Sequence, residues 1–177
     1  AVADRIRSEA AEAVAAVRSR GVRTIRLISG DAEPAALAIA EGVGIGREDV
    51  RAALLPAGKV EAVRVLRGLP DVRAVAMVGD GINDAPALAA ADVGIAMGTG
   101  SAAIARDVAD VTIVADDLRR VAWFLALAGR TRRTIITNVA LALGIKLVVL
   151  VLATFGFANL WMAIAADTGA TVLVALN

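Results

Sequence analysis

Hydrophobic and polar positions divide the chain into two parts with different patterns. In residues 1–116, short apolar or β-branched runs alternate with amphipathic stretches of helical period. This pattern predicts strands over residues 24–28, 50–54, 73–78, 93–97 and 111–114. Helices are predicted over residues 3–20, 34–41, 59–67, 85–90 and 102–108. Because strands that alternate with helices are typical of βαβ units, the first part predicts an α/β fold with a parallel sheet.

The pattern changes at residue 117. Residues 117–134 predict one helix, which contains the five arginines Arg119, Arg120, Arg130, Arg132 and Arg133. Residues 135–157 are apolar with a single charge and span about 34 Å as a helix, enough for a hydrocarbon core of about 30 Å. A short turn at 156–159 separates them from a second apolar stretch, 160–176. The pattern therefore predicts a transmembrane α-helical hairpin, with the arginine-rich side in the cytoplasm.

Composition narrows the possible functions. Hydrophobic residues make up 58% of the chain, above the ~45–50% that is usual in soluble domains. The net charge of +1 gives no basic patch for nucleic acid. The chain has no His and no Cys, which excludes disulfides, thiolate metal sites and imidazole ligands. The first residues include neither an initiator Met nor a signal peptide, so we expect a piece of a longer protein.

The clearest candidate for chemistry follows the predicted strand 73–78. Asp80 and Asp84 lie four residues apart in a loop that also contains Gly79 and Gly81. In a parallel α/β sheet, ligands bind beyond the carboxyl ends of the strands. Hard carboxylate oxygens suit Mg²⁺, which takes few protein ligands and shares the rest with water and phosphate. The loop therefore predicts phosphoryl transfer.

Two other predicted strands end near groups that suit a phosphoryl group. Ser29-Gly30-Asp31 follows strand 24–28 and offers a hydroxyl and backbone amides, although this tripeptide is also common in ordinary turns. Lys59 follows strand 50–54 at the start of a predicted helix, where a cation would neutralise phosphoryl charge. Taken alone, a lysine such as Lys59 is most often a solvated helix residue. Together, three strand ends supply a hydroxyl, a lysine and a pair of carboxylates.

Two charges lie inside the predicted membrane spans. Lys146 and Asp167 are about 18 Å and 14 Å from the turn that joins the two helices. A charge at mid-bilayer costs at least ~2.5–3.5 kcal/mol on insertion scales, so each needs a partner or a function. We expect the two to pair or to face one transport site, and a purely structural ion pair is the alternative.

The motifs in the first part resemble a known family. Ser29-Gly30-Asp31, Pro56 to Lys59 and the string Gly-Asp-Gly-Ile-Asn-Asp-Ala-Pro-Ala-Leu, from Gly79 to Leu88, resemble the phosphorylation domain of P-type ATPases. That domain belongs to the haloacid-dehalogenase-like superfamily. The match continues through residues 91–98, and Asp4 and Arg7 resemble the family's hinge from the nucleotide-binding domain.

This resemblance implies a haloacid-dehalogenase-like, Rossmann-type parallel sheet and a site for ATP and Mg²⁺. It implies that Asp80 and Asp84 hold Mg²⁺ with support from Asn83, and that Ser29 and Lys59 contact the phosphoryl group. Ser29 stands where the family more often has Thr.

The resemblance also implies that the sheet is incomplete. The family's phosphorylated aspartate lies in Asp-Lys-Thr-Gly-Thr, a string that does not occur in this sequence. Its strand would lie beside strands 24–28 and 73–78, where its absence leaves backbone groups unpaired. We therefore expect the C-terminal portion of a larger pump. Its parts are half of the phosphorylation domain (1–116), a stalk helix (117–134) and two transmembrane helices (135–177).

The membrane part resembles a subgroup of this family. Residues 138–146 and 166–171 resemble the last two membrane helices of zinc-, cadmium- and lead-exporting P-type ATPases. The resemblance implies that Asp167 binds the transported divalent cation and that Lys146 is a built-in counter-ion.

The implied activity is ATP-driven heavy-metal export through an aspartyl-phosphate. The chain alone is expected to be inactive, because the nucleophile lies outside it. The implied partners are the lipid bilayer, the transported cation, ATP and the rest of the pump, with its nucleotide-binding and actuator domains and other transmembrane helices. The implied location is the bacterial plasma membrane, with the α/β part cytoplasmic. The alternative is a non-catalytic, truncated membrane protein that binds Mg²⁺ or phosphate or docks on a pump.

Overall fold

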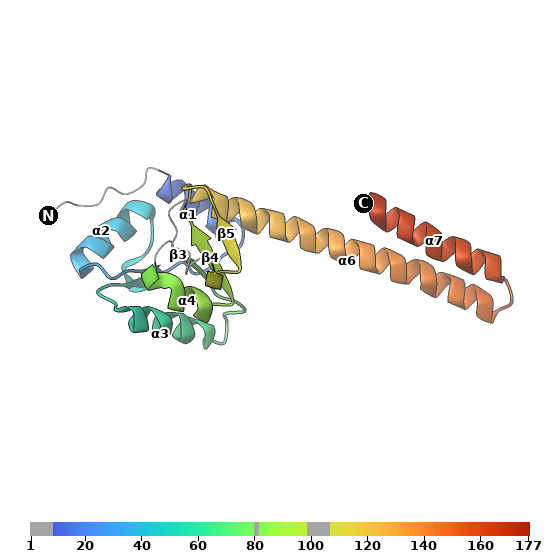
Figure 1. Ribbon diagram of the computed structural model, residues 1–177, viewed down its shortest axis with the longest axis horizontal. Helices are drawn as coiled ribbons and strands as arrows, with labels where there is room; N and C mark the ends of the chain where they lie inside the picture. Colours follow the sequence, from blue (N-terminus) through green and yellow to red (C-terminus); the bar gives the residue numbers. More distant parts are fainter. Residues whose placement is uncertain (1–8, 80–81, 99–106) are drawn as a thin grey trace. The chain divides into compact units, whose positions relative to one another are not determined.

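The computed structural model describes residues 9–79, 82–98 and 107–177 (Figure 1). The chain forms two compact units, Ala1–Leu125 and Ala126–Asn177. Asp4, Arg7, Asp80 and most of the predicted helix 102–108 lie outside the described residues.

The first unit alternates helices with short strands, which confirms the predicted α/β class. Its helices are α1 (Ala10–Ser19), α2 (Glu33–Val43), α3 (Pro56–Arg67) and α4 (Ala85–Ala90), and α6 begins in it at Arg119. Short 3-10 turns cover Arg47–Asp49 and Ile82–Asp84. Its strands are β1 (Leu27–Ile28), β2 (Val50–Arg51), β3 (Ala76–Gly79), β4 (Val93–Met97) and β5 (Val111–Ile113).

The strands form two parallel sheets. One pairs β1 with β2, and the other has the order β3-β4-β5. In the described part of the chain no ladder joins β1 to β3, and it is between these two that the sequence places the missing strand. β2 is shorter than predicted because Ala53 has a φ of +53°, outside the extended region, and so ends the strand. β1 is correspondingly short, since β2 is its only neighbour among the described strands.

Local sequence sets several helix boundaries. Pro lies in the first turn of α2, α3 and α4, where its missing N–H has no helical partner to lose. α2 ends at Gly44, whose φ of +75° is the left-handed conformation that glycine adopts at a helix C-terminus. These signals fix where the helices begin after the loops that contain the candidate site.

The core of the first unit lies on both faces of β4. Ala96 packs on one face with Val63 of α3, Met77 of β3 and Leu88 of α4. Ile95 and Met97 point to the opposite face, as alternate strand residues do, and pack with Val121 near the start of α6. Gly94 lies under α4, because a Cβ at this position would be 2.8 Å from the Leu88 carbonyl oxygen.

The second unit is helical. α6 runs from Arg119 to Thr154 as one 36-residue helix, so the predicted stalk and first span are continuous. It ends before the predicted residue 157, at a turn in which Gly156 has a φ of +76°. α7 covers Leu160–Leu176, and the Asn159 side chain caps it by accepting a hydrogen bond from the Met162 N–H at 2.9 Å.

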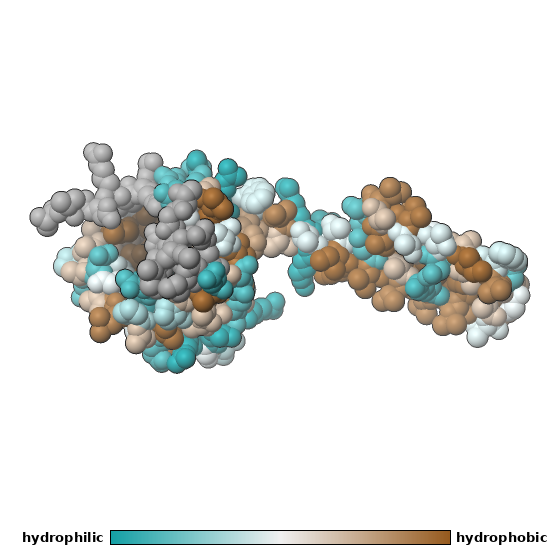
Figure 2. All heavy atoms as spheres, viewed as in Figure 1, coloured by the Kyte–Doolittle hydropathy of each residue, from teal (hydrophilic) through white to brown (hydrophobic). Residues whose placement is uncertain are grey.

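Apolar side chains are exposed along both of these helices (Figure 2). Of the helices in the described residues, α6 is long and apolar enough to cross a membrane, judged by length and composition. α7 is apolar and, at 17 residues, shorter. The prediction of two complete spans therefore stays a prediction for α7.

Candidate functional site

The loops that follow β1 and β2 are held together by backbone hydrogen bonds. The Ser29 N–H donates to the Arg51 carbonyl at 2.8 Å, and the Leu54 N–H donates to the Ser29 carbonyl at 3.0 Å. The Ala53 N–H donates to the Asp31 carbonyl at 2.7 Å. These bonds fix the predicted Ser29-Gly30-Asp31 loop beside the residues that lead into α3.

The Ser29 hydroxyl lies in a local turn with Asp31. Its Oγ donates to Asp31 Oδ2 at 2.7 Å and accepts from the Asp31 N–H at 3.1 Å. Gly30 and Asp31 are exposed. A Cβ on Gly30 would be 3.3 Å from the Leu54 carbonyl oxygen, which is tighter than most Cβ contacts. The loop therefore presents a hydroxyl that already donates to an anionic oxygen.

Lys59 and Asp84 form an ion pair. Lys59 Nζ lies 2.6 Å from Asp84 Oδ1, and the two side chains are 13% and 16% exposed. Lys59 is in the first turn of α3, and Asp84 directly precedes α4, so the pair joins the loops that follow β2 and β3. The structure thus brings together two residues that the sequence assigned to one site. Because the pair is largely buried, removing either partner would leave a costly unpaired charge, unlike the loss of an exposed pair.

Gly79, the last residue of β3, lets Asp84 approach the end of the strand. A Cβ at this position would lie 2.8 Å from Asp84 Cβ and 2.9 Å from Asp84 Oδ2. Contacts this short do not occur between real side chains, so only glycine fits. Sequence analysis placed Gly79 in the loop but did not find this packing role, which depends on contact across the loop.

The oxygen donors at this strand end fit Mg²⁺ in kind. Asp84 supplies a carboxylate, and Asn83, exposed in the 3-10 turn, supplies an amide oxygen. Asp80 lies outside the described residues, and the structure says nothing of its place. Within the described ranges, no three acidic, His or Cys side chains form a group that could hold a metal.

The start of α6 is fixed by ion pairs. Arg119 Nε and Nη2 donate to the Asp117 carboxylate at 3.0–3.2 Å, and Arg119 Nη1 lies 3.4 Å from Glu12 Oε2. The Asp117 carboxylate also accepts from the Arg119 N–H at 3.0 Å, at the helix N-terminus. Side-chain hydrogen bonding from Arg119 is the main reason that the pKa of Asp117 lies below its usual value.

In the second unit the structure brings together Lys146 of α6 and Asp167 of α7. Their Nζ and Oδ1 atoms are 2.9 Å apart, with the side chains 59% and 65% exposed. The Thr171 hydroxyl donates to the Asp167 carbonyl at 2.9 Å. Sequence analysis missed a second polar contact between the helices, in which Asn177 Nδ2 donates to Asn138 Oδ1 at 2.7 Å.

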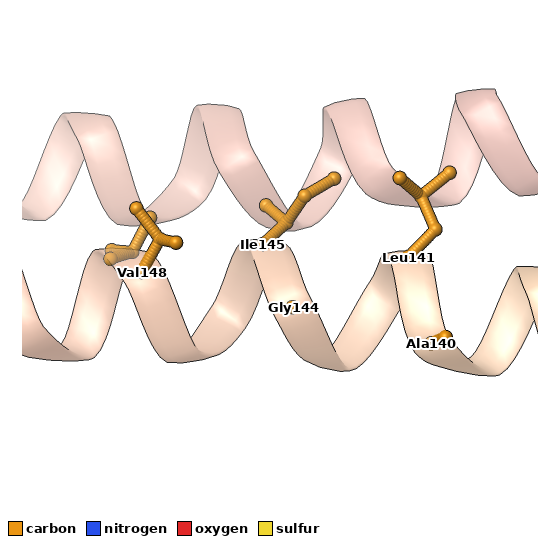
Figure 3. Close-up of a pocket in the computed structure, with 6 residues that line it drawn as sticks. Ala140, Leu141, Gly144, Ile145 and Val148 are labelled. Atoms are coloured by element: carbon orange, nitrogen blue, oxygen red, sulfur yellow. The ribbon is translucent and has the colours of Figure 1, made fainter.

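An open apolar groove of about 370 Å³ lies along α6 (Figure 3). Its lining is entirely from this helix, and Leu141, Ile145 and Val148 project from the helix in the close-up. Ala140 and Gly144 form its floor, because small residues leave space between larger ones. The groove has no polar side chain, so it offers packing surface and no chemistry.

Known proteins are similar in sequence to this chain over nearly its whole length. A family model described as "Hydrolase: haloacid dehalogenase-like hydrolase" matches residues 1–92. The chain is 39% identical over 178 residues to a cadmium, zinc and cobalt-transporting ATPase of Bacillus subtilis, which covers 99% of the chain and 25% of that protein. It is 39% identical to a zinc-transporting ATPase of Synechocystis, with 99% of the chain and 24% of that protein covered.

A solved structure has a similar fold over nearly the whole chain. The crystal structure of a zinc-transporting PIB-type ATPase in an E2.Pi state is 41% identical, with a TM-score of 0.87. The alignment covers 98% of this chain and 27% of that one. The chain therefore spans about a quarter of the length of the relatives it matches.

Proposed function

The chain belongs to the haloacid dehalogenase-like hydrolase family, and we propose that it is the C-terminal portion of an ATP-driven pump that exports divalent heavy-metal cations. The observation that carries this proposal is similarity along the whole chain. The similarity extends over 98–99% of the chain, and so over both the α/β unit and the apolar helices. The relatives named for cadmium and zinc transport support a cation of that class.

In the α/β unit we assign phosphoryl transfer to the three strand-end loops. The Ser29 hydroxyl, which now donates to Asp31, would donate to a phosphoryl oxygen, and the Gly30 and Asp31 backbone would shape that contact. Lys59 would neutralise phosphoryl charge, since its ammonium is already directed to an anionic oxygen, that of Asp84. The phosphorylated aspartate itself would come from the part of the pump outside this chain.

Mg²⁺ would be held by Asp80 and Asp84, with Asn83 in support. When bound, it would neutralise charge on the phosphate oxygens. The residues of this chain would position those oxygens: Gly79 allows Asp84 to lie at the strand end, and Lys59 holds its carboxylate there. ATP is then the phosphoryl donor, bound mainly by the rest of the pump.

In the helical unit we assign cation binding to Asp167. Its carboxylate is a hard ligand on an apolar hairpin, and Lys146 is the cation that would replace the transported ion when this leaves. We place the apolar helices in a bacterial plasma membrane, with the α/β unit in the cytoplasm. The arginines that precede the apolar part of α6 support this orientation.

The experiment uses the full-length protein that contains this chain and measures ATP hydrolysis stimulated by Zn²⁺. Asp167→Asn keeps the size of the side chain and removes its charge, and we expect stimulation to fall at least about tenfold. Thr168→Val changes a neighbour on α7 whose side chain makes no hydrogen bond in the described structure, and this matched control should keep the stimulation. Wild-type stimulation in Asp167→Asn would overturn the cation-site assignment.

A second variant tests the α/β unit separately. Lys59→Gln should reduce formation of the acid-stable phosphoenzyme from ATP, because the cation beside the phosphoryl group is lost. Asp167→Asn and Lys59→Gln therefore affect different steps. Phosphoenzyme formation at the wild-type rate in Lys59→Gln would contradict the assignment of Lys59.

A further inference from the structure

Three arginines of α6 lie directly before its apolar stretch. Arg130, Arg132 and Arg133 are all exposed, and none makes an ion pair in the part of the chain that the structure describes. We call these three residues the arginine collar. Arg119, on the same helix, differs because it is paired with Asp117 and Glu12. The charge of the collar is therefore available to a partner outside this chain.

No acidic side chain of the same segment can compensate the collar. Between Asp117 and Asp167 the sequence has no Asp or Glu. Along a helix, about 1.5 Å per residue separates Asp117 from the nearest collar residue by more than a Debye length of about 8–10 Å. A local positive potential therefore persists at this level of the helix.

The directions of the collar side chains indicate what kind of partner fits. At about 100° per residue, Arg133 lies about 60° from Arg130 around the helix, while Arg132 lies on nearly the opposite side, about 200° away. A protein surface or a single nucleotide would meet one side of the helix. A layer of headgroups meets all sides at one depth, and the collar matches that geometry.

The position of the collar along α6 fits the edge of a bilayer. Phe155, Phe157 and Trp161, at the other end of the hairpin, are 74%, 74% and 77% exposed. Of these, Trp161 is of the residue type that is enriched at membrane interfaces. From Arg133 to Phe155 the helix rises about 33 Å, close to the hydrocarbon thickness of about 30 Å. The collar and the aromatic residues thus mark two opposite interfaces.

We propose that the arginine collar binds the phosphate groups of anionic glycerophospholipids in the cytoplasmic leaflet. The guanidinium group can donate two parallel hydrogen bonds to one phosphate, and all three basic residues here are arginine. The proposal rests on the proposed function in one respect, the placement of α6 in a membrane. It adds a specific lipid contact that export activity does not require.

The test is a titration of the full-length protein, in an uncharged detergent, with short-chain phosphatidylglycerol. Short-chain phosphatidylcholine and inorganic phosphate are titrated in parallel. We expect saturable binding of phosphatidylglycerol that weakens at high salt, with at least tenfold weaker binding of the other two. Inorganic phosphate binding as tightly as phosphatidylglycerol would mean a free-anion site and would overturn the proposal.

The decisive variant is the triple Arg130→Gln, Arg132→Gln, Arg133→Gln. At about fivefold in affinity for each arginine, we expect a loss of about 100-fold. The control triple removes three exposed arginines from the α/β unit: Arg20→Gln, Arg23→Gln and Arg64→Gln. Equal losses in the two triples would mean a general effect of net charge and would refute the collar.

The triple variant Arg130→Lys, Arg132→Lys, Arg133→Lys keeps the positive charge. It therefore separates a loss of charge from a general disturbance of the helix. It should bind phosphatidylglycerol within about tenfold of the wild type, whereas a loss as large as that of the glutamine triple would refute the electrostatic argument. Zn²⁺-stimulated ATP hydrolysis is measured separately. If the protein hydrolyses ATP but does not prefer phosphatidylglycerol, only the proposal of lipid binding by the collar is overturned. If it prefers phosphatidylglycerol but shows no Zn²⁺-stimulated hydrolysis, only the proposed pump function is overturned.

Discussion

Replacing Gly79 with alanine adds one methyl group where β3 meets Asp84. The new Cβ would lie 2.8 Å from Asp84 Cβ and 2.9 Å from Asp84 Oδ2. Ordinary contact begins near 3.4 Å, so Asp84 has to move by about 0.6 Å. Because Lys59 Nζ is bonded to Asp84 Oδ1 at 2.6 Å, that movement stretches or breaks the ion pair.

The size of the effect follows from this displacement. A misplacement of about 1 Å in a catalytic group can cost about 100-fold in rate, so we expect Gly79→Ala to slow phosphoenzyme formation about 10- to 100-fold. The expected loss of stability is about 1–3 kcal/mol, the usual cost of crowding by one methyl group.

The assay is single-turnover formation of phosphoenzyme from ATP in the full-length protein, together with its melting temperature. Gly58→Ala is the matched control, since its Cβ would approach only the Leu54 side chain, at 3.3 Å from Cδ2 and 3.5 Å from Cβ. Both variants add one methyl group beside Lys59 or its partner. If the Gly79→Ala variant forms phosphoenzyme at the wild-type rate, the argument that this glycine positions Asp84 is refuted.

Three other predictions concern stability and the hydroxyl site. Gly94→Ala should destabilise the α/β unit by about 1–3 kcal/mol in chemical denaturation, because its Cβ would meet helix backbone at 2.8 Å; Gly144→Ala, with nothing within 4 Å, should not. The lowered pKa of Asp117 means that its pairing with Arg119 stabilises the fold above the usual aspartate pKa and is lost as pH falls through the lower folded value. Asp117→Asn should therefore lose this pH dependence in thermal melts at acidic pH, and an unchanged profile would contradict it. Ser29→Ala should slow phosphoenzyme formation about tenfold through loss of a charge-assisted hydrogen bond, while Ser29→Thr should retain it.

The periodicity of apolar residues predicted the fold class correctly. The bounds of individual strands depend on the backbone conformation of single residues, which periodicity does not predict. β4 has the predicted bounds, because Val93–Met97 is a run of apolar residues and glycine, buried from Gly94 onward. β2 is shorter than predicted because Ala53 adopts a left-handed conformation, which is unusual for alanine and has no sequence signal. α6 joins the predicted stalk and first span in one helix, since a change from charged to apolar composition does not interrupt helical hydrogen bonds.

The candidate site shows the same limit. Strand-end logic placed Lys59 and Asp84 in one site because parallel strands end at the same edge of a sheet, and the two are in fact bonded. The same logic could not find the contact between Gly79 and Asp84 or the amide pair Asn138–Asn177. Both depend on how segments approach each other, which a single sequence does not encode in any local pattern.

The packing of β4 has a mechanical consequence. One face of this strand contacts α4, which begins directly after Asp84, and the other contacts the start of α6 near Val121. Protein interiors are close-packed and scarcely compressible, so a push on α4 is transmitted rather than absorbed. The strand β4 therefore connects α4 mechanically to the start of α6. A displacement of Asp84 would therefore reach the first turn of α6 through packed side chains.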